Sequence, residues 1–83
     1  MTSPEQAQEV DRNYDFFMRT LSSYLAEHRN EFALIRHQAI VAFFEKPGDA
    51  YRTGMSRFSD TLFSIQEVTD EPIDLGFFSH VAH

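Results

Sequence analysis

Two short apolar runs on either side of His37-Gln38 constrain the fold of this chain more than any other feature. The runs read FALIR and AIVAFFE, and their Ile, Val and Phe residues favour β-strands. A connection of two residues predicts an antiparallel hairpin over residues 31–45. A half-exposed hairpin alternates apolar and polar side chains, whereas this one is apolar on both faces. Each face therefore needs a cover.

The turn and the register of this hairpin are predicted together. Two-residue turns favour Asn-Gly or Asp-Gly, so His37-Gln38 is an unusual pair, and a slipped or longer loop is the alternative. With His37-Gln38 as the turn, the expected pairs are Arg36 with Ala39, Ile35 with Ile40, Leu34 with Val41, Ala33 with Ala42 and Phe32 with Phe43. One face then carries Phe32, Leu34, Val41 and Phe43, and the other carries Ala33, Ile35, Ile40, Ala42 and Phe44.

A helix is predicted over residues 4–28. Ser3 and Gln6 fit a capping box, and Pro4 suits the first helical position. The segment forms either one helix or a frayed turn followed by a firm helix from Arg12, and Asn30 suits a left-handed residue after it. Apolar or aromatic side chains recur at steps of three and four, at Val10, Tyr14, Phe17, Leu21, Tyr24 or Leu25, and His28.

A second helix is predicted over residues 47–59. Pro47 suits its first turn and Asp49 favours its N-terminus electrostatically, although Lys46 stands where Ser, Thr or Asp would cap it better. Gly54 lowers helix propensity by about 1 kcal/mol relative to Ala. We therefore expect this glycine to allow a close approach between helix and sheet.

The last elements are one strand and a tail. LFSIQEV predicts a half-buried strand over residues 62–68, because apolar and polar side chains alternate there. Residues 69–83 contain Pro72 and Gly76 as breakers, so an extended tail is expected. The tail is rich in apolar side chains, which indicates that it lies against another surface.

These elements predict a single α+β domain over residues 1–83 with a small, mostly antiparallel three-stranded sheet in the order 2-1-3. The first hairpin strand should be central because it is the more apolar on both sides. The second helix should cover one face of the sheet. The N-terminal helix, the tail or a second copy could cover the other, and we expect the N-terminal helix to do so. Apolar surface left over predicts a homodimer; the alternative is a monomer that covers its own sheet.

The core of the sequence also resembles a group of small bacterial proteins of unknown function. The resemblance covers residues 25–80, where EFALIRHQAIVAFFEKPGDAYRTGMSRFSDTLFSIQEV is followed by EPIDLGFFSH. It implies a strand-strand-helix-strand core, with Ala50, Gly54 and Phe58 spaced as in the group's helix. The chain departs from the pattern at His37-Gln38, where a Gly-containing pair is usual, and at Lys46. The resemblance implies an architecture and no activity.

Composition and charge exclude several classes of function. The chain has no cysteine, which excludes disulfides and Cys-based zinc sites. No apolar run is long enough to span a membrane and no basic, apolar signal region is present, which predicts a cytoplasmic protein. The net charge is −6, which disfavours binding to nucleic acid. Residues 60–83 carry five carboxylates and no Lys or Arg, so this end either aids solubility or meets a basic partner.

No pattern in the sequence predicts catalysis. His80 and His83 have a spacing that suits two metal ligands, but their position at the chain end favours solvent-exposed histidines. The carboxylates within residues 67–74 match neither a calcium loop nor an acid–base pair in a predicted cleft. No nucleophile elbow or glycine-rich phosphate loop is present. We therefore predict no enzymatic activity, no metal and no cofactor.

The predicted function is protein interaction, as a homodimeric accessory domain that binds an unknown protein and neither nucleic acid nor membrane. One alternative is an acidic inhibitor or antitoxin-like protein whose residues 60–83 occupy a basic site. Another is a small enzyme or ligand-binding protein with a pocket between the first helix and the sheet. The aromatic stripe of the first helix forms either core or a partner groove. The candidate interaction surface comprises Tyr14, Phe16, Phe17, Leu75, Phe77, Phe78, Asp70, Glu71 and Asp74.

Overall fold

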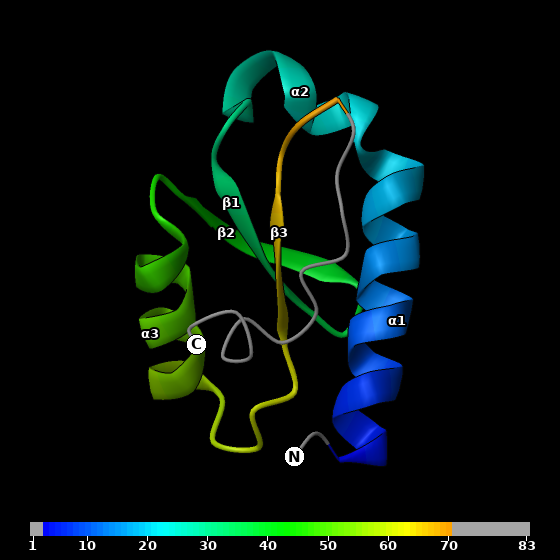
Figure 1. Cartoon of the computed structure of the whole chain (residues 1–83), viewed down its shortest axis with the longest axis vertical. Coiled ribbons are helices and arrows are strands. Elements are labelled where there is room, and N and C mark those ends of the chain that lie inside the picture. Colours follow the sequence, from blue (N-terminus) through cyan, green and yellow to red (C-terminus); the bar gives the residue numbers. More distant parts are fainter. Residues whose placement is uncertain (1–2, 71–83) are drawn as a thin grey trace.

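Three helices and a three-stranded antiparallel sheet make up the described part of the chain (Figure 1). The computed structural model describes residues 3–70. The predicted α+β class and the strand order β2-β1-β3 are confirmed, with β1 central. Residues 71–83 of the predicted tail lie outside the described residues. The elements are α1 (Pro4–Thr20), α2 (Ser22–His28), β1 (Phe32–Arg36), β2 (Ala39–Phe44), α3 (Pro47–Arg57) and β3 (Ser64–Glu67).

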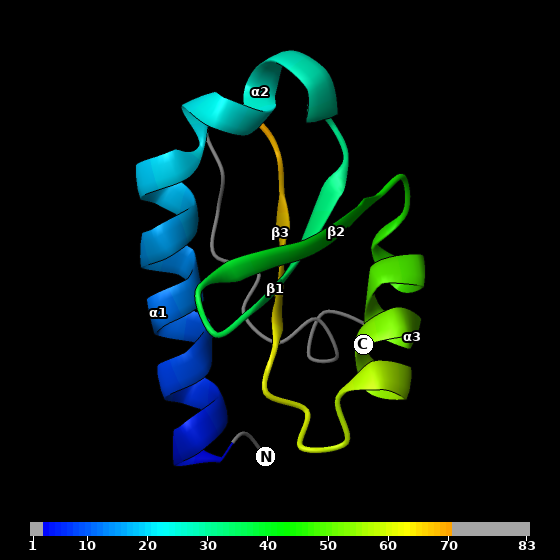
Figure 2. The same cartoon turned by 180° about the vertical axis from the view of Figure 1, so that it is seen from behind.

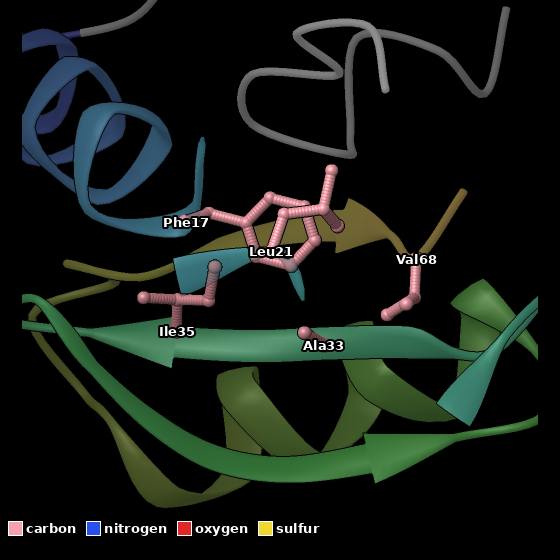
Figure 3. Close-up of a cluster of buried hydrophobic side chains, with 5 residues drawn as sticks. All are labelled: Phe17, Leu21, Ala33, Ile35 and Val68. Atoms are coloured by element: carbon pink, nitrogen blue, oxygen red, sulfur yellow. The ribbon is translucent and has the colours of Figure 1, made fainter. Parts of the chain in front are cut away.

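The sheet is covered on both faces by helices from its own chain. Seen from either side, α1 and α3 flank the sheet (Figures 1 and 2). On one face, Phe17 and Leu21 pack against Ala33, Ile35 and Val68 (Figure 3). On the other face, the buried cluster consists of Leu34, Ala50, Phe63 and Ile65. The long N-terminal helix is therefore a cover of the second face, as predicted.

The predicted single helix over residues 4–28 is wrong, because it breaks at Leu21. The start is as expected: the Ser3 and Gln6 capping box is formed and helix α1 begins at Pro4, so the first turn is not frayed. At the end of α1, the Thr20 hydroxyl donates to the Phe16 carbonyl at 2.9 Å, a local bond that competes with regular helical bonding. The chain then changes direction into α2, which crosses the end of the sheet (Figure 1).

The His37-Gln38 turn has two residues, as predicted. Both residues adopt positive φ, 50° at His37 and 60° at Gln38, which is the geometry of a type I′ hairpin turn. Asn30 has φ 70° after the helical segment, again as predicted. The alternative of a longer loop is therefore excluded.

The predicted register is right next to the turn and wrong beyond it. Arg36 pairs with Ala39 and Ile35 with Ile40, but a β-bulge then shifts the pairing by one residue. The observed partners beyond the bulge are Ala42 for Leu34, Phe43 for Ala33 and Phe44 for Phe32. A shift of one residue exchanges the faces of all side chains that follow. Phe43 therefore joins the α1 side and Phe44 the α3 side, the reverse of the expectation.

Helix α3 approaches the sheet closely through Gly54. A methyl group at this position would lie 2.7 Å from ring carbons of Phe63, so only glycine fits without displacement. The close approach predicted from Gly54 is thus confirmed. The regular elements are shorter than predicted, because α3 ends at Arg57 and β3 is limited to Ser64–Glu67.

Candidate protein-interaction edge

Strand β2 forms an apolar edge of the sheet. Within residues 3–70, β2 pairs with β1 alone, and its six residues, AIVAFF, are all uncharged and none is buried. The central strand differs, because Leu34 and Ile35 are 0% exposed. We call residues 39–44 the β2 edge. An apolar strand with unpaired backbone groups along one side is a template for pairing with another chain.

On the α1 side, the β2 edge is covered only in part. Helix α1 packs mainly against β1 and β3, while Ile40 and Phe43 pack at the margin of the cluster of Phe17, Leu21, Ala33, Ile35 and Val68. The His28 ring stacks on Phe43 at 3.7 Å between centroids, and Tyr24 lies 5.5 Å away. The His28 Nδ1 atom also lies 2.7 Å from a Glu31 carboxylate oxygen. These contacts hold Phe43 in place and leave it half-buried.

On the α3 side, two residues of the β2 edge pack against the margin of the buried cluster beneath α3. Val41 and Phe44 pack against the cluster of Leu34, Ala50, Phe63 and Ile65 but remain half-buried. Both faces of the edge therefore carry large side chains that the core already fixes and that a partner could still cover. Further burial of such apolar area is worth about 25 cal/mol per Å².

Two buried polar residues of α1 hold the hairpin turn that precedes β2. The Asn13 amide group donates to the Ile35 carbonyl at 3.1 Å and to Glu9 Oε2 at 3.0 Å. Its carbonyl oxygen accepts from the Gln38 backbone N–H at 2.8 Å and from the Gln38 side chain at 3.0 Å. Glu9 accepts from the His37 backbone N–H at 2.6 Å. Buried polar networks that are fully bonded define one geometry, so α1 fixes the start of the β2 edge.

Arg36, at the end of β1, ties the α3–β3 connection to the sheet. Its guanidinium donates to both Asp60 carboxylate oxygens, at 2.7 and 3.0 Å, and to the Leu62 carbonyl at 3.2 Å. It also lies 4.4 Å from the centroid of the Phe58 ring. The Arg36 hydrogen bonds and the Leu62 backbone N–H hold the pKa of Asp60 well below its ordinary value. Asp60 is therefore paired with Arg36 of the same chain, although its carboxylate lies at the surface.

The predicted interaction residues fall into four groups. Phe17 is 0% exposed and lies in the core, so its assignment to an interaction surface is wrong: α1 turns this side chain toward the sheet. Tyr14 and Phe16 are half-buried, and Phe16 packs against the same cluster. Asp70 is exposed and pairs with Arg29 at 2.9 Å, which lowers the Asp70 pKa. Leu75, Phe77, Phe78, Glu71 and Asp74 lie outside the described residues.

Sequence reasoning missed the residues of the β2 edge as a site, although it noted their unusual apolar pattern. The signal was present in AIVAFF, a strand without the Lys or Pro that protects many natural edges. The roles of Glu9 and Asn13 left no such signal. Their spacing of four places them on one helix face, but only the fold brings that face to the turn.

Other kinds of site receive no support from residues 3–70. This part of the chain contains no group of three or more His, Cys, Asp or Glu side chains that could hold a metal ion. Its helices are too short or too polar for a transmembrane span. Comparison of the chain with protein-family models, with curated proteins and with solved structures gives no match.

Proposed function

We propose that this chain is a homodimeric, non-enzymatic protein-interaction domain that binds other chains by strand addition at the β2 edge. The observation that carries the proposal is the contrast between two adjacent strands of similar composition. The middle of β1 is fully buried, whereas every residue of β2 retains exposed surface and one side of its backbone faces no strand within residues 3–70. In strand addition, main-chain hydrogen bonds supply affinity and alternate side chains supply specificity.

The surroundings of the β2 edge support this role because they make it rigid. Asn13 and Glu9 hold the turn before it, and the His28 ring stacks on Phe43 near its end. A binding element that is already ordered loses less conformational entropy when a partner binds. The edge is therefore preorganised for recognition.

The alternative of an acidic inhibitor has weaker support. Within residues 60–70, two of the three carboxylates, Asp60 and Asp70, already pair with Arg36 and Arg29 of the same chain. Capture of a basic partner through them would have to break these pairs. No observation on the described residues favours a cofactor, a substrate or a reaction, and the proposal assigns none.

The test is affinity capture from an extract of the cells that produce the protein, with matched bait variants. Val41→Lys introduces at the β2 edge the residue type that natural edges use to prevent pairing. Met18→Lys is the control, because Met18 is an apolar residue of α1 that is 43% exposed. We expect wild type and Met18→Lys to retain the same specific partner and Val41→Lys to lose it.

The baits must be compared as folded proteins, so circular dichroism and thermal unfolding accompany the capture. Equal capture by a folded Val41→Lys variant would contradict binding at the edge. Capture of no protein by wild type would contradict the accessory role.

A further inference from the structure

We infer that the β2 edge recognises the β2 edge of a second copy, in an antiparallel pair whose two-fold axis passes between Val41 and Ala42. This inference rests on the proposed function and names one partner for the same edge. It produces a continuous six-stranded sheet from two three-stranded ones. The bulge, the two faces of the strand and the charges beside it all favour this pair.

The bulge in β2 selects an identical strand as partner. A bulge adds one residue to one strand of a pair, bends that strand and prevents regular pairing with a straight neighbour. Bulges are for this reason among the devices that protect sheet edges. Two copies related by a two-fold axis at the bulge each contribute the same extra residue at the same level. Val41 of one copy then faces Ala42 of the other, and the mismatch disappears.

The faces of the side chains agree with this register and disagree with a shift of one residue in either direction. Residues directly opposite each other in an antiparallel pair point to the same face of the sheet. Ile40 and Phe43 both lie on the α1 side, and Val41 and Phe44 on the α3 side. Pairing Ile40 with Phe43 of the second copy satisfies this condition. A shift of one residue in either direction would pair Phe43 with Ala39 or with Val41. Both residues lie on the α3 side, Ala39 by its pairing with Arg36 and Val41 by its packing contacts, whereas Phe43 lies on the α1 side.

The bulge is what makes this register symmetric. In a regular strand, residues three apart point to opposite faces, so Ile40 and Phe43 could not face each other across a two-fold axis. Here Leu34 pairs with Ala42 and Ile35 with Ile40, and the inserted residue returns Phe43 to the face of Ile40. The same register pairs Ala39 of one copy with Phe44 of the other.

Charge and layer structure are compatible with the pair. Residues 39–44 contain no charged side chain, so no like charges meet along the contact. Beyond the strand, the register places Glu45 opposite Gln38, an acceptor opposite a donor. The two-fold axis also keeps α1 of both copies on one face and α3 of both copies on the other. Since α1 packs mainly on β1 and β3, it lies away from the new contact.

The contact is small, and the dimer should be reversible. Six residues of strand extend about 20 Å. Standard interfaces use roughly 20–30 residues on each side. We therefore expect a monomer–dimer equilibrium that shifts with concentration in light scattering and that Val41→Lys moves toward the monomer. Met18→Lys should leave the equilibrium where it is.

Cysteine cross-linking tests the register itself, because the natural chain has no cysteine. Ile40→Cys and Phe43→Cys are prepared separately, reduced, mixed and oxidised. In the inferred register these positions face each other, within the roughly 4.4–6.8 Å between Cα atoms that a disulfide requires. In a dimer of Ile40→Cys alone, the two new thiols are offset by three residues along the strand, roughly 10 Å, which is too far. We expect the disulfide dimer to be several-fold more abundant in the mixture than in either variant alone.

Ala39→Cys mixed with Phe44→Cys repeats the test with a different pair, in case the loss of the Phe43 ring disturbs the fold. Disulfide dimers that form equally well in single variants would overturn the register. A wild-type chain that scatters as a monomer at every concentration would overturn the dimer. That second result would also remove the homodimer from the proposed function, but it would leave the edge-dependent capture of another protein untouched, so dimerisation and capture fail separately.

Discussion

At the scale of single residues, the fold is most sensitive at helical positions whose surroundings do not tolerate a typical helix-forming side chain. Gly54 is one, because the Phe63 ring occupies the space in which a methyl group would lie. Asn13 is another, because it is 0% exposed and its amide group donates to the Ile35 carbonyl of β1 and accepts from the Gln38 backbone N–H of the turn. Neither residue could be replaced by the best helix former without loss.

Gly54→Ala should lower stability although alanine favours a helix by about 1 kcal/mol. The added methyl group would lie 2.7 Å from Phe63 ring carbons and force the helix or the ring to move. Overpacking of this kind costs about 1–3 kcal/mol, so the net result is a loss, measured by urea unfolding. Gly48→Ala is the matched control, since its new methyl group would meet only the end of the Arg52 side chain at 3.4 Å. A gain in stability for Gly54→Ala would contradict the packing argument.

Asn13→Asp should destabilise the hairpin turn. The substitution keeps the shape and the acceptor for Gln38 but replaces the donor that reaches Glu9 and the Ile35 carbonyl by an oxygen. A buried group that loses its partner costs about 1–3 kcal/mol, and two acceptors then face each other. Chemical unfolding should show this loss. The reverse exchange at an exposed position of the same helix, Asp11→Asn, should change stability by less than about 0.5 kcal/mol.

At the scale of elements, hydrogen bonds and ion pairs from distant side chains fix the position of each connection relative to the sheet. Arg36 joins the end of β1 to the α3–β3 connection through Asp60, and the Gln6 side chain donates to the Thr61 hydroxyl of the same connection. Asn13 and Glu9 do the same for the β1–β2 turn. In each case a side chain distant in sequence fixes a loop conformation, since the loops themselves are too short to contain a core.

The ion pair between Arg36 and Asp60 makes the stability of the fold depend on pH. The pKa of Asp60 is lower in the folded chain than its ordinary value because of the hydrogen bonds from Arg36 and from the Leu62 backbone. The folded state therefore binds fewer protons, and the resulting stability is complete above the unfolded pKa of about 3.9 and is lost as the pH falls below it. Asp60→Asn should flatten part of the acid-side loss of stability. Urea unfolding measured from neutral to acidic pH checks this, and Arg36→Met should have the same effect. An unchanged acid slope in both variants would show that the pair contributes nothing.

At the scale of the whole molecule, residues 3–70 form a thin sheet with a helical cover on each face, and within these residues the apolar edge strand β2 is covered only in part. Apolar composition on both sides of the hairpin predicted the two covers, and α1 and α3 provide them. The covers do not extend fully over β2, where Ile40, Val41, Phe43 and Phe44 remain half-buried. Concentration-dependent association through this edge is the property of the whole molecule that the proposals predict.

The order of the elements, the two-residue turn and the central place of β1 could be read from local patterns. Periodicity and capping depend on neighbouring residues, as Ser3 with Gln6 shows, so they are visible in the sequence. Local patterns do not reveal whether the aromatic face of the first helix is a candidate interaction surface. An aromatic stripe that contains Phe17 looks the same whether it forms core or a groove, and only its position against Ala33 and Ile35 distinguishes the two.

What the sequence determined by itself is therefore the class of fold and the need to cover a sheet that is apolar on both faces. Tertiary structure alone decided the break at Leu21, the bulge after Ile40 and the exposure of β2. Each of these depends on where side chains from separate segments meet: the bulge places Phe43 beneath His28 and Phe44 beside the α3 core. Such choices balance packing between distant parts of the chain, and no local pattern of residues records that balance.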